Sequence, residues 1–89
     1  MQAYVLIQTE ASGRPIAEAL RSVPGVLDAD DLSGPFDAIA LAAADSIRAL
    51  GDQVVAEIQR IPGVIRALSA PLVGSLGGSV ERGDGSRAA

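Results

Sequence analysis

The sequence contains no cysteine, histidine, lysine or tryptophan, and its only aromatic residues are Tyr4 and Phe36. Without cysteine and histidine the chain has no disulfide, no thiolate or imidazole metal ligand, no cysteine nucleophile and no imidazole base. Most common catalytic groups are therefore absent. We expect no metal site and no bound cofactor.

Basic residues are also few. Seven arginines against eleven aspartates and glutamates give a net charge of −4. The non-specific attraction that draws proteins to phosphate backbones needs an excess of positive charge. We therefore expect no direct binding to nucleic acid.

Long hydrophobic runs are missing as well. The longest candidate, Ala38–Ala44, has seven residues between two aspartates, whereas a membrane span needs roughly 20. The N-terminus has no basic segment, and Gln8 and Glu10 interrupt its apolar stretch, which is unlike a targeting signal. The sequence predicts a cytoplasmic protein that does not contact membranes.

Eighty-nine residues, 48% of them hydrophobic, suit one small domain with a core of Ala, Val, Ile and Leu. The composition changes at Gly74, because the last sixteen residues hold five of the ten glycines. Such a segment buries too little apolar surface to offset the entropy of ordering. The sequence predicts a folded domain over residues 1–73 and a flexible C-terminal tail over residues 74–89.

An internal repeat organises the folded part. The segment Val-Pro-Gly-Val-Leu at 23–27 recurs as Ile-Pro-Gly-Val-Ile at 61–65, thirty-eight residues later. Upstream apolar residues recur at the same offset with the spacing of a helix face, and they are Ile16, Leu20 and Val23, then Val54, Ile58 and Ile61. Pro and Gly end each helix and a strand follows, which predicts two helix, turn and strand units.

A strand-like run precedes each unit, so the element order is β-α-β-β-α-β. The predicted helices cover 14–22 and 46–60, and the predicted strands include 3–9, 26–33 and 37–43, with a fourth after the second Pro-Gly. Two right-handed βαβ halves produce the ferredoxin-like α+β fold, with four antiparallel strands in the spatial order 4-1-3-2 and both helices on one face. Pro71 is tolerated because the fourth strand is an edge. Gly51 predicts a kink or a close-packing position in the second helix.

The sheet face away from the helices is also predicted to be apolar. A sheet covered on one side normally alternates apolar and polar residues, but the first and third strands do not. We expect this face to form a homodimer about a twofold axis, as in a dimeric α+β barrel, through Tyr4, Leu6, Ala38, Ala40 and Ala42. The alternative is an alanine-rich face that stays in contact with water.

Three aspartates cluster in the second predicted strand. Asp28, Asp30 and Asp31 offer the oxygen ligands that Ca²⁺ and Mg²⁺ prefer, but their spacing does not fit an EF-hand loop. In a strand Asp28 and Asp30 share a face and Asp31 points the other way. We interpret the cluster as a charged edge strand that resists aggregation.

Four segments follow one another in a distinctive order. They are Val-Pro-Gly-Val at 23–26, Leu-Ser-Gly-Pro-Phe-Asp at 32–37, Ala-Asp-Ser at 44–46 and Ile-Pro-Gly-Val-Ile-Arg-Ala-Leu-Ser at 61–69. Together they resemble the effector-binding domain of the Lrp/AsnC family, also called the RAM domain, over about residues 3–73. Full-length members carry a preceding helix-turn-helix DNA-binding segment, whereas only Met1 and Gln2 precede the domain here, as in stand-alone RAM proteins.

The resemblance implies dimers formed through the sheets, association into rings, and an amino-acid effector between neighbouring dimers. It also implies full-length Lrp/AsnC regulators as a further kind of partner. By position in the family's ligand site, the matching residues are Gly34, Phe36, Asp37 and Ser69. Gly34 would offer a backbone N–H and Asp37 a carboxylate to the charged ends of an amino acid.

The alternative for the same segment is a plain hairpin turn, in which Asp37 bonds only nearby backbone N–H groups. The sequence departs from the family at Pro35, where an acidic or polar residue is common, and at Ala38, where tyrosine is common. Both changes reduce the polar groups available to a ligand.

The predicted function is a non-enzymatic module that binds a small effector, an amino acid, at a subunit interface and acts in transcriptional or metabolic regulation. One alternative is a small dimeric α+β barrel enzyme of isomerase or oxygenase type, in which only Asp, Glu, Arg, Ser and Tyr4 would serve for acid-base work. Another is a purely structural oligomerisation partner of full-length regulators.

Overall fold

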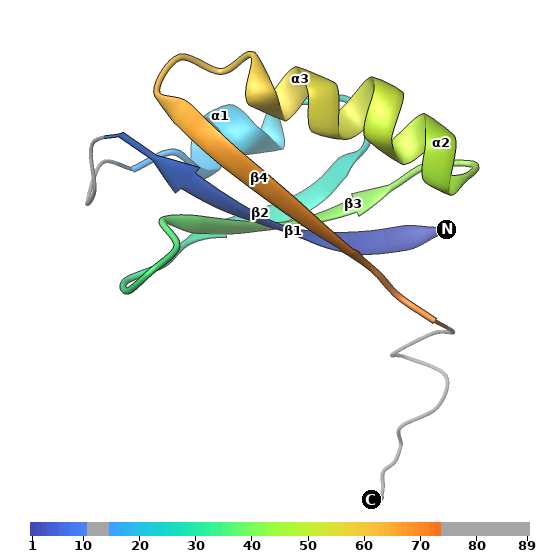
Figure 1. The fold of residues 1–89 in the computed structure, drawn as a ribbon, viewed down its shortest axis with the longest axis horizontal. Coiled ribbons are helices and arrows are strands. Elements are labelled where there is room, and N and C mark those ends of the chain that lie inside the picture. The colour runs from blue at the N-terminus through green and yellow to red at the C-terminus, as the bar shows by residue number, and fades with distance from the viewer. Residues whose placement is uncertain (11–14, 74–89) are drawn as a thin grey trace, which may run out of the picture.

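The most apolar strands form the middle of the sheet. A computed structural model gives the structure of residues 1–10 and 15–73. The strands are β1 (Gln2–Thr9), β2 (Val26–Asp31), β3 (Ala38–Ala43) and β4 (Val64–Pro71), all paired antiparallel in the order β2-β3-β1-β4. The helices cover one face of this sheet and leave the other open (Figure 1). The predicted ferredoxin-like α+β fold and strand order are confirmed, and Pro71 lies in an edge strand.

The first helix is shorter than predicted. It covers Ala17–Arg21, labelled α1, instead of residues 14–22. The Asp31 carboxylate, from the end of β2, accepts hydrogen bonds from the backbone N–H groups of Ile16 (2.8 Å) and Ala17 (3.1 Å). The backbone N–H groups at the start of a helix have no partner within the helix, and here this carboxylate accepts their hydrogen bonds, so α1 begins at this point.

The second helix is one continuous run in three parts, namely α2 (Ile47–Ala49), the π-helical η1 (Leu50–Val55) and α3 (Ala56–Gln59). The Ser46 hydroxyl caps its start by accepting a hydrogen bond from the Ala49 N–H at 3.0 Å. Gly51, where a kink is one of the two predictions, lies in this π-helical turn. The close-packing alternative is wrong, because a Cβ added at Gly51 would meet no atom within 4 Å in the part of the chain that the structure describes.

The two repeat units have the same geometry. Gly25 and Gly63 take positive φ values of 96° and 94°, which glycine adopts cheaply. Each turn closes with an equivalent backbone bond, Val26 N–H to Val23 O at 3.0 Å and Val64 N–H to Ile61 O at 3.1 Å. The two predicted helix, turn and strand units are confirmed.

The core lies between the helices and the sheet. The predicted helix faces are confirmed, since Leu20 and Ile58 are fully buried and the other members are buried or half-buried. From the sheet, alternate residues of β1 and β3 point into this core, namely Ala3, Val5, Ile7, Ala38, Ala40 and Ala42.

This arrangement corrects the predicted dimer face. Ala38, Ala40 and Ala42 are at most 1% exposed and face the helices, so they do not share a face with Tyr4 and Leu6. The pairing register decides this, because Ala40 stands opposite buried Val5, while Ile39 and Leu41 stand opposite Leu6 and Tyr4. Cross-strand partners lie on the same face of a sheet.

The predicted flexible tail, residues 74–89, lies outside the described residues. The folded elements within residues 1–73 extend from Gln2 to Pro71. Across residues 1–10 and 15–73, no helix is long and apolar enough to cross a membrane.

Candidate functional site

The β2–β3 turn, residues 32–37, is fastened to the end of β1. The Asp37 carboxylate accepts hydrogen bonds from the Thr9 N–H at 2.7 Å and from the Thr9 hydroxyl at 3.2 Å. The Asp37 N–H donates to the Ile7 carbonyl at 2.8 Å, and the side chain of Gln8 donates to the Pro35 carbonyl at 2.9 Å. Asp37 is buried, so its carboxylate positions the turn and the strand end together.

The structure brings three of the four predicted ligand residues together. Gly34, Phe36 and Asp37 share the β2–β3 turn, where Gly34 takes a φ of 125° and Phe36 is half-buried. Ser69 does not join them. It is an exposed residue of β4 opposite Val5, on the far side of β1 from the turn.

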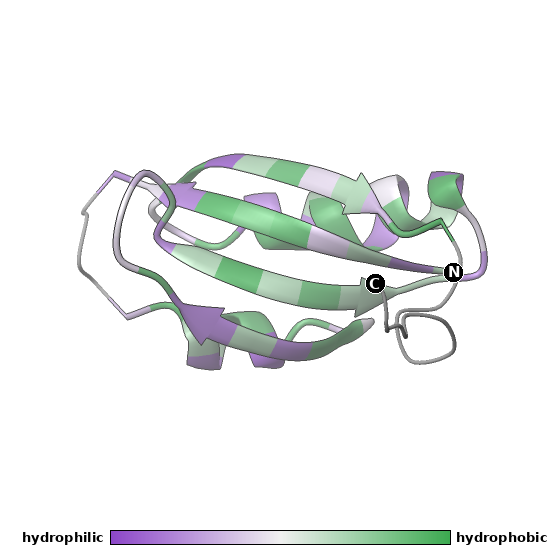
Figure 2. Ribbon diagram, turned by 90° about the horizontal axis from the view of Figure 1, so that it is seen from below, coloured by the Kyte–Doolittle hydropathy of each residue, from purple (hydrophilic) through white to green (hydrophobic). Residues whose placement is uncertain are grey.

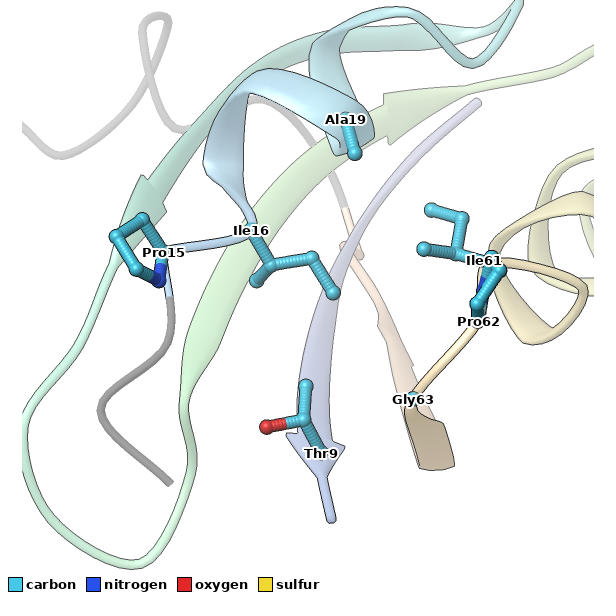
Figure 3. Close-up of a pocket in the computed structure, with 7 residues that line it drawn as sticks. All are labelled: Thr9, Pro15, Ile16, Ala19, Ile61, Pro62 and Gly63. Atoms are coloured by element: carbon cyan, nitrogen blue, oxygen red, sulfur yellow. The ribbon is translucent and has the colours of Figure 1, made fainter. Parts of the chain in front are cut away.

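A pocket of about 190 Å³ opens beside Thr9, where the start of α1 faces the turn between α3 and β4 (Figure 3). Its lining residues are Thr9, Pro15, Ile16, Ala19, Ile61, Pro62 and Gly63. Among the residues that the structure describes, Thr9 supplies the one polar side chain of this lining, and the same residue is bonded to Asp37. The pocket is therefore mainly apolar, and through Thr9 it lies next to the β2–β3 turn that contains the predicted ligand residues.

Two sequence features that line this pocket have the pattern of structural residues and carry no separate signal of ligand binding. Ile16 and Ile61 have the spacing of helix faces, and the second Pro-Gly has the pattern of a helix end. Their meeting depends on the pseudo-symmetric packing of the two units. Glu10 N–H donates to Gly63 O and Ala43 N–H donates to Gly25 O, both at 2.8 Å, so the second turn is joined to the residue that follows β1 and the first turn to the last residue of β3.

The open face of the sheet is the second candidate surface. Figure 2 shows hydrophobic residues along β4, β1 and β3 and hydrophilic residues along the β2 edge. Tyr4, Leu6, Ile39 and Leu41 are half-buried in the single chain, and Leu68 is 40% exposed. A shallow hollow of about 150 Å³ lies over this face between Tyr4, Leu41 and the two aspartates Asp28 and Asp30.

The predicted division of the aspartates is confirmed. Asp28 and Asp30 stand opposite Leu41 and Ile39 on the open face, while Asp31 turns to the helical side and holds the start of α1. In the described part of the chain, no group of three or more His, Cys, Asp or Glu side chains is arranged to hold a metal ion.

These two surfaces offer binding chemistry: an apolar chamber beside a hydrogen-bonded carboxylate, and a wide apolar sheet face. A model of the Lrp/AsnC ligand binding domain matches residues 2–73. The chain therefore belongs to this family of regulatory ligand-binding domains. A comparison with curated proteins gives no match.

Solved structures agree with this assignment. The crystal structure of TTHA0845 from Thermus thermophilus is similar, with a TM-score of 0.63, 28% identity, and coverage of 83% of this chain and 96% of that chain. The leucine response regulatory protein LrpA of Mycobacterium tuberculosis is similar with a TM-score of 0.71 and 25% identity, over 84% of this chain and 51% of that chain.

A third similar structure is the transcriptional regulator NMB0573 of Neisseria meningitidis, crystallised as a complex with L-Met. Its TM-score is 0.66 at 21% identity, over 84% of this chain and 51% of that chain. The chain thus spans about half the length of these two regulators and nearly all of the Thermus protein.

Proposed function

We propose that the protein is a non-enzymatic sensor that binds an amino acid with an aliphatic side chain and passes the bound state on through a homo-oligomer. The observation that carries this proposal is the apolar pocket next to the Asp37 and Thr9 pair. Membership of a ligand-binding regulatory family supports it, as does the L-Met complex of a regulator with the same fold.

The chemistry of the pocket selects the class of ligand. A volume of about 190 Å³ lined by Ile16, Ile61 and other apolar residues accepts an aliphatic side chain and excludes a charged one. The charged ends of the amino acid would then lie toward the β2–β3 turn, where Gly34, Phe36 and Asp37 are found. Ser69 would contribute only from a neighbouring copy, because it lies on the far side of β1.

The proposed effect of ligand binding is a change in the oligomeric assembly. The open face around Tyr4 and Leu6 joins two copies, and such dimers associate further. A ligand that contacts two dimers at once favours the assembled form by its higher affinity for that form. Full-length Lrp/AsnC regulators are the partners through which this assembly would influence transcription, without direct contact of this chain with DNA.

A thermal-shift screen of the twenty amino acids tests the proposal. A ligand at 100 times its Kd stabilises the folded state by about 2.7 kcal/mol. We expect aliphatic amino acids to raise Tm and acidic or basic ones to leave it unchanged. A rise in Tm with charged amino acids only would contradict the proposal that the apolar pocket binds the ligand. No rise in Tm with any of the twenty would contradict the proposal of an amino-acid effector.

A pocket-filling variant locates the site. Ala19 is exposed and lines the pocket, so Ala19→Phe should abolish the shift caused by an active amino acid while the chain stays folded. Gln53→Phe, at an exposed position of η1, is the matched control and should keep the shift. Light scattering then measures the mass of the oligomer with and without the ligand. A mass that changes with the ligand indicates a sensor, and a mass that stays the same favours the structural role.

A further inference from the structure

The first helix is held in place by a side chain from another element. α1 has five residues, and its N-cap residue, Ile16, has no side-chain hydrogen bond that caps the helix. An isolated helix of this length is unstable in water, so its position depends on tertiary contacts. The Asp31 carboxylate supplies one, because a single oxygen, Oδ1, accepts hydrogen bonds from the N–H groups of both Ile16 and Ala17. Asp31 therefore fixes where α1 begins.

The start of α1 is also one wall of the apolar pocket. Pro15, Ile16 and Ala19 line this wall, and residues 61–63 line the wall opposite (Figure 3). The side chain of Ile16 points into the space between the two walls. The width of the pocket thus depends on the position of α1, which Asp31 holds although it does not itself line the pocket.

The second helix begins without help from a distant residue. Its cap is local, because the Ser46 hydroxyl accepts a hydrogen bond from the Ala49 N–H three residues later. The turn that follows α1 is packed against this helix, since a Cβ added at Gly25 would lie 2.6 Å from Val54 Cγ2. A Cβ added at Gly63, in the turn at the pocket, would meet no atom of the described residues within 4 Å. The open pocket and the helix that is held from a distance therefore occur together.

Asp31 also connects the pocket to the base of the β2–β3 turn. It is the last residue of β2 and stands opposite Ala38. The next residue, Leu32, donates its N–H to the Asp37 carbonyl at 2.8 Å, and the Asp37 carboxylate binds Thr9 at the pocket. The base of the turn is thus bonded to the pocket at two places, the start of α1 and the end of β1.

We propose that Asp31 is a positioning residue of the pocket, which holds the start of α1 at the separation from the α3–β4 turn at which an aliphatic side chain fits. It does so without contacting the ligand. When its hydrogen bonds are lost, α1 occupies this position for only a fraction of the time, and the apparent affinity falls by that fraction. This role rests on the proposed function, because it requires that the pocket binds an aliphatic amino acid.

Affinity measurements test this role. We expect Asp31→Ala to raise the Kd of L-leucine roughly tenfold, because the binding-competent position of α1 is less populated. Asp31→Asn should keep the Kd within about threefold of the wild-type value, because asparagine retains a side-chain oxygen that can accept both hydrogen bonds. Isothermal titration calorimetry measures both effects, with L-methionine titrated in parallel.

Two controls separate positioning from stability and from charge. Ser46→Ala removes the cap of the second helix, away from the pocket, so it should lower Tm and leave the Kd unchanged. Asp30→Ala removes the same charge from the neighbouring residue, whose side chain is 74% exposed and lies 3.8 Å from Arg21. Such an exposed pair is weak, so this variant should also keep the wild-type Kd.

Amide hydrogen exchange measures the two hydrogen bonds directly. In the wild-type chain, L-leucine should slow exchange at Ile16 and Ala17, because a ligand that binds better when α1 is in place also stabilises that position. In Asp31→Ala both amides should exchange faster before the amino acid is added. The Ala49 N–H, which is bonded to Ser46, is the internal control and should change in neither experiment.

The outcomes distinguish this role from the proposed function. A wild-type chain that binds neither L-leucine nor L-methionine overturns the proposed function and the role of Asp31 with it. Binding that is unchanged in Asp31→Ala overturns the role of Asp31 alone. An equal loss of affinity in Ser46→Ala overturns it too, since the loss would then follow from lower stability.

A second variant covers the case in which Asp31→Ala does not fold, as judged by circular dichroism. Asp31→Glu keeps the negative charge and moves the accepting oxygen by one carbon–carbon bond, so the start of α1 must shift or lose its hydrogen bonds. The Kd of L-leucine should rise in this variant. An unchanged Kd would overturn the proposed role of Asp31.

Discussion

Asp37 joins two parts of the chain that lie 28 residues apart, the β2–β3 turn and the end of β1. A carboxylate that accepts charge-assisted hydrogen bonds from a backbone N–H and a hydroxyl while buried contributes more than a neutral acceptor would. Its neighbour Thr9 also lines the apolar pocket. The residue that orders the turn is therefore next to the proposed ligand.

Replacing Asp37 by asparagine keeps the size and removes the charge. We expect Asp37→Asn to lower the free energy of unfolding by about 1.5–3 kcal/mol, because the bonds from Thr9 lose their ionised acceptor. Urea denaturation measures this. Asp52→Asn, at an exposed helix position, is the control and should change stability by less than about 0.5 kcal/mol. Unchanged stability with a ten- to hundredfold loss of ligand affinity would instead assign Asp37 to ligand binding.

At the scale of the elements, the repeated helix, turn and strand unit appears twice with the same backbone but different surroundings. Gly25 and Gly63 have nearly equal positive φ values. A Cβ added at Gly25 would lie 2.6 Å from Val54 Cγ2 and 3.2 Å from the Ala43 carbonyl, whereas one at Gly63 would meet no atom of the described residues within 4 Å. The first turn is packed against η1, and the second lies at the pocket.

Because the surroundings differ, a glycine-to-alanine substitution should lower the free energy of unfolding by different amounts at the two turns. Gly63→Ala should destabilise by about 1 kcal/mol, the cost of a left-handed conformation for an alanine. Gly25→Ala bears the same cost and adds overpacking against Val54, about 1–3 kcal/mol more. Thermal and urea unfolding of the two variants measure the difference. Equal destabilisation would show that the backbone conformation alone matters.

At the scale of the whole molecule, one apolar surface is buried within the chain and another is left open. The helices cover the face that carries Val5 and Ala40, while Tyr4, Leu6 and Leu41 stay on the uncovered side. Leaving a leucine-sized side chain in water forgoes about 1.5–3 kcal/mol. Face-to-face packing of two copies would recover this free energy.

A double change on the open face tests its role. Tyr4→Asp combined with Leu6→Asp should yield a monomer or prevent folding, because the interface would bury unpaired carboxylates. Ile47→Asp is the control, since Ile47 is 66% exposed on α2 and lies on the helical layer. Sedimentation velocity distinguishes the species. If the double variant sediments as the wild type does, the open face is not the interface.

Local patterns were enough to predict the element order, the strand order and the helix faces. Short stretches of sequence encode the two turns at Gly25 and Gly63 and the helix faces that contain Leu20 and Ile58. The predictions made from these stretches are confirmed. The turn that groups Gly34 with Asp37 is equally local. For this chain the sequence by itself determined the ferredoxin-like fold and the place of the β2–β3 turn.

The tertiary structure decided which side of β3 faces the helices, because that strand is apolar on both sides and only its pairing with β1 places Ala40 in the core. It also decided that Asp37 bonds Thr9, that Asp31 begins α1, and that Ile16 meets Pro62 in a pocket. Each of these contacts joins residues distant in the chain. Such contacts depend on register and packing, which no local pattern specifies.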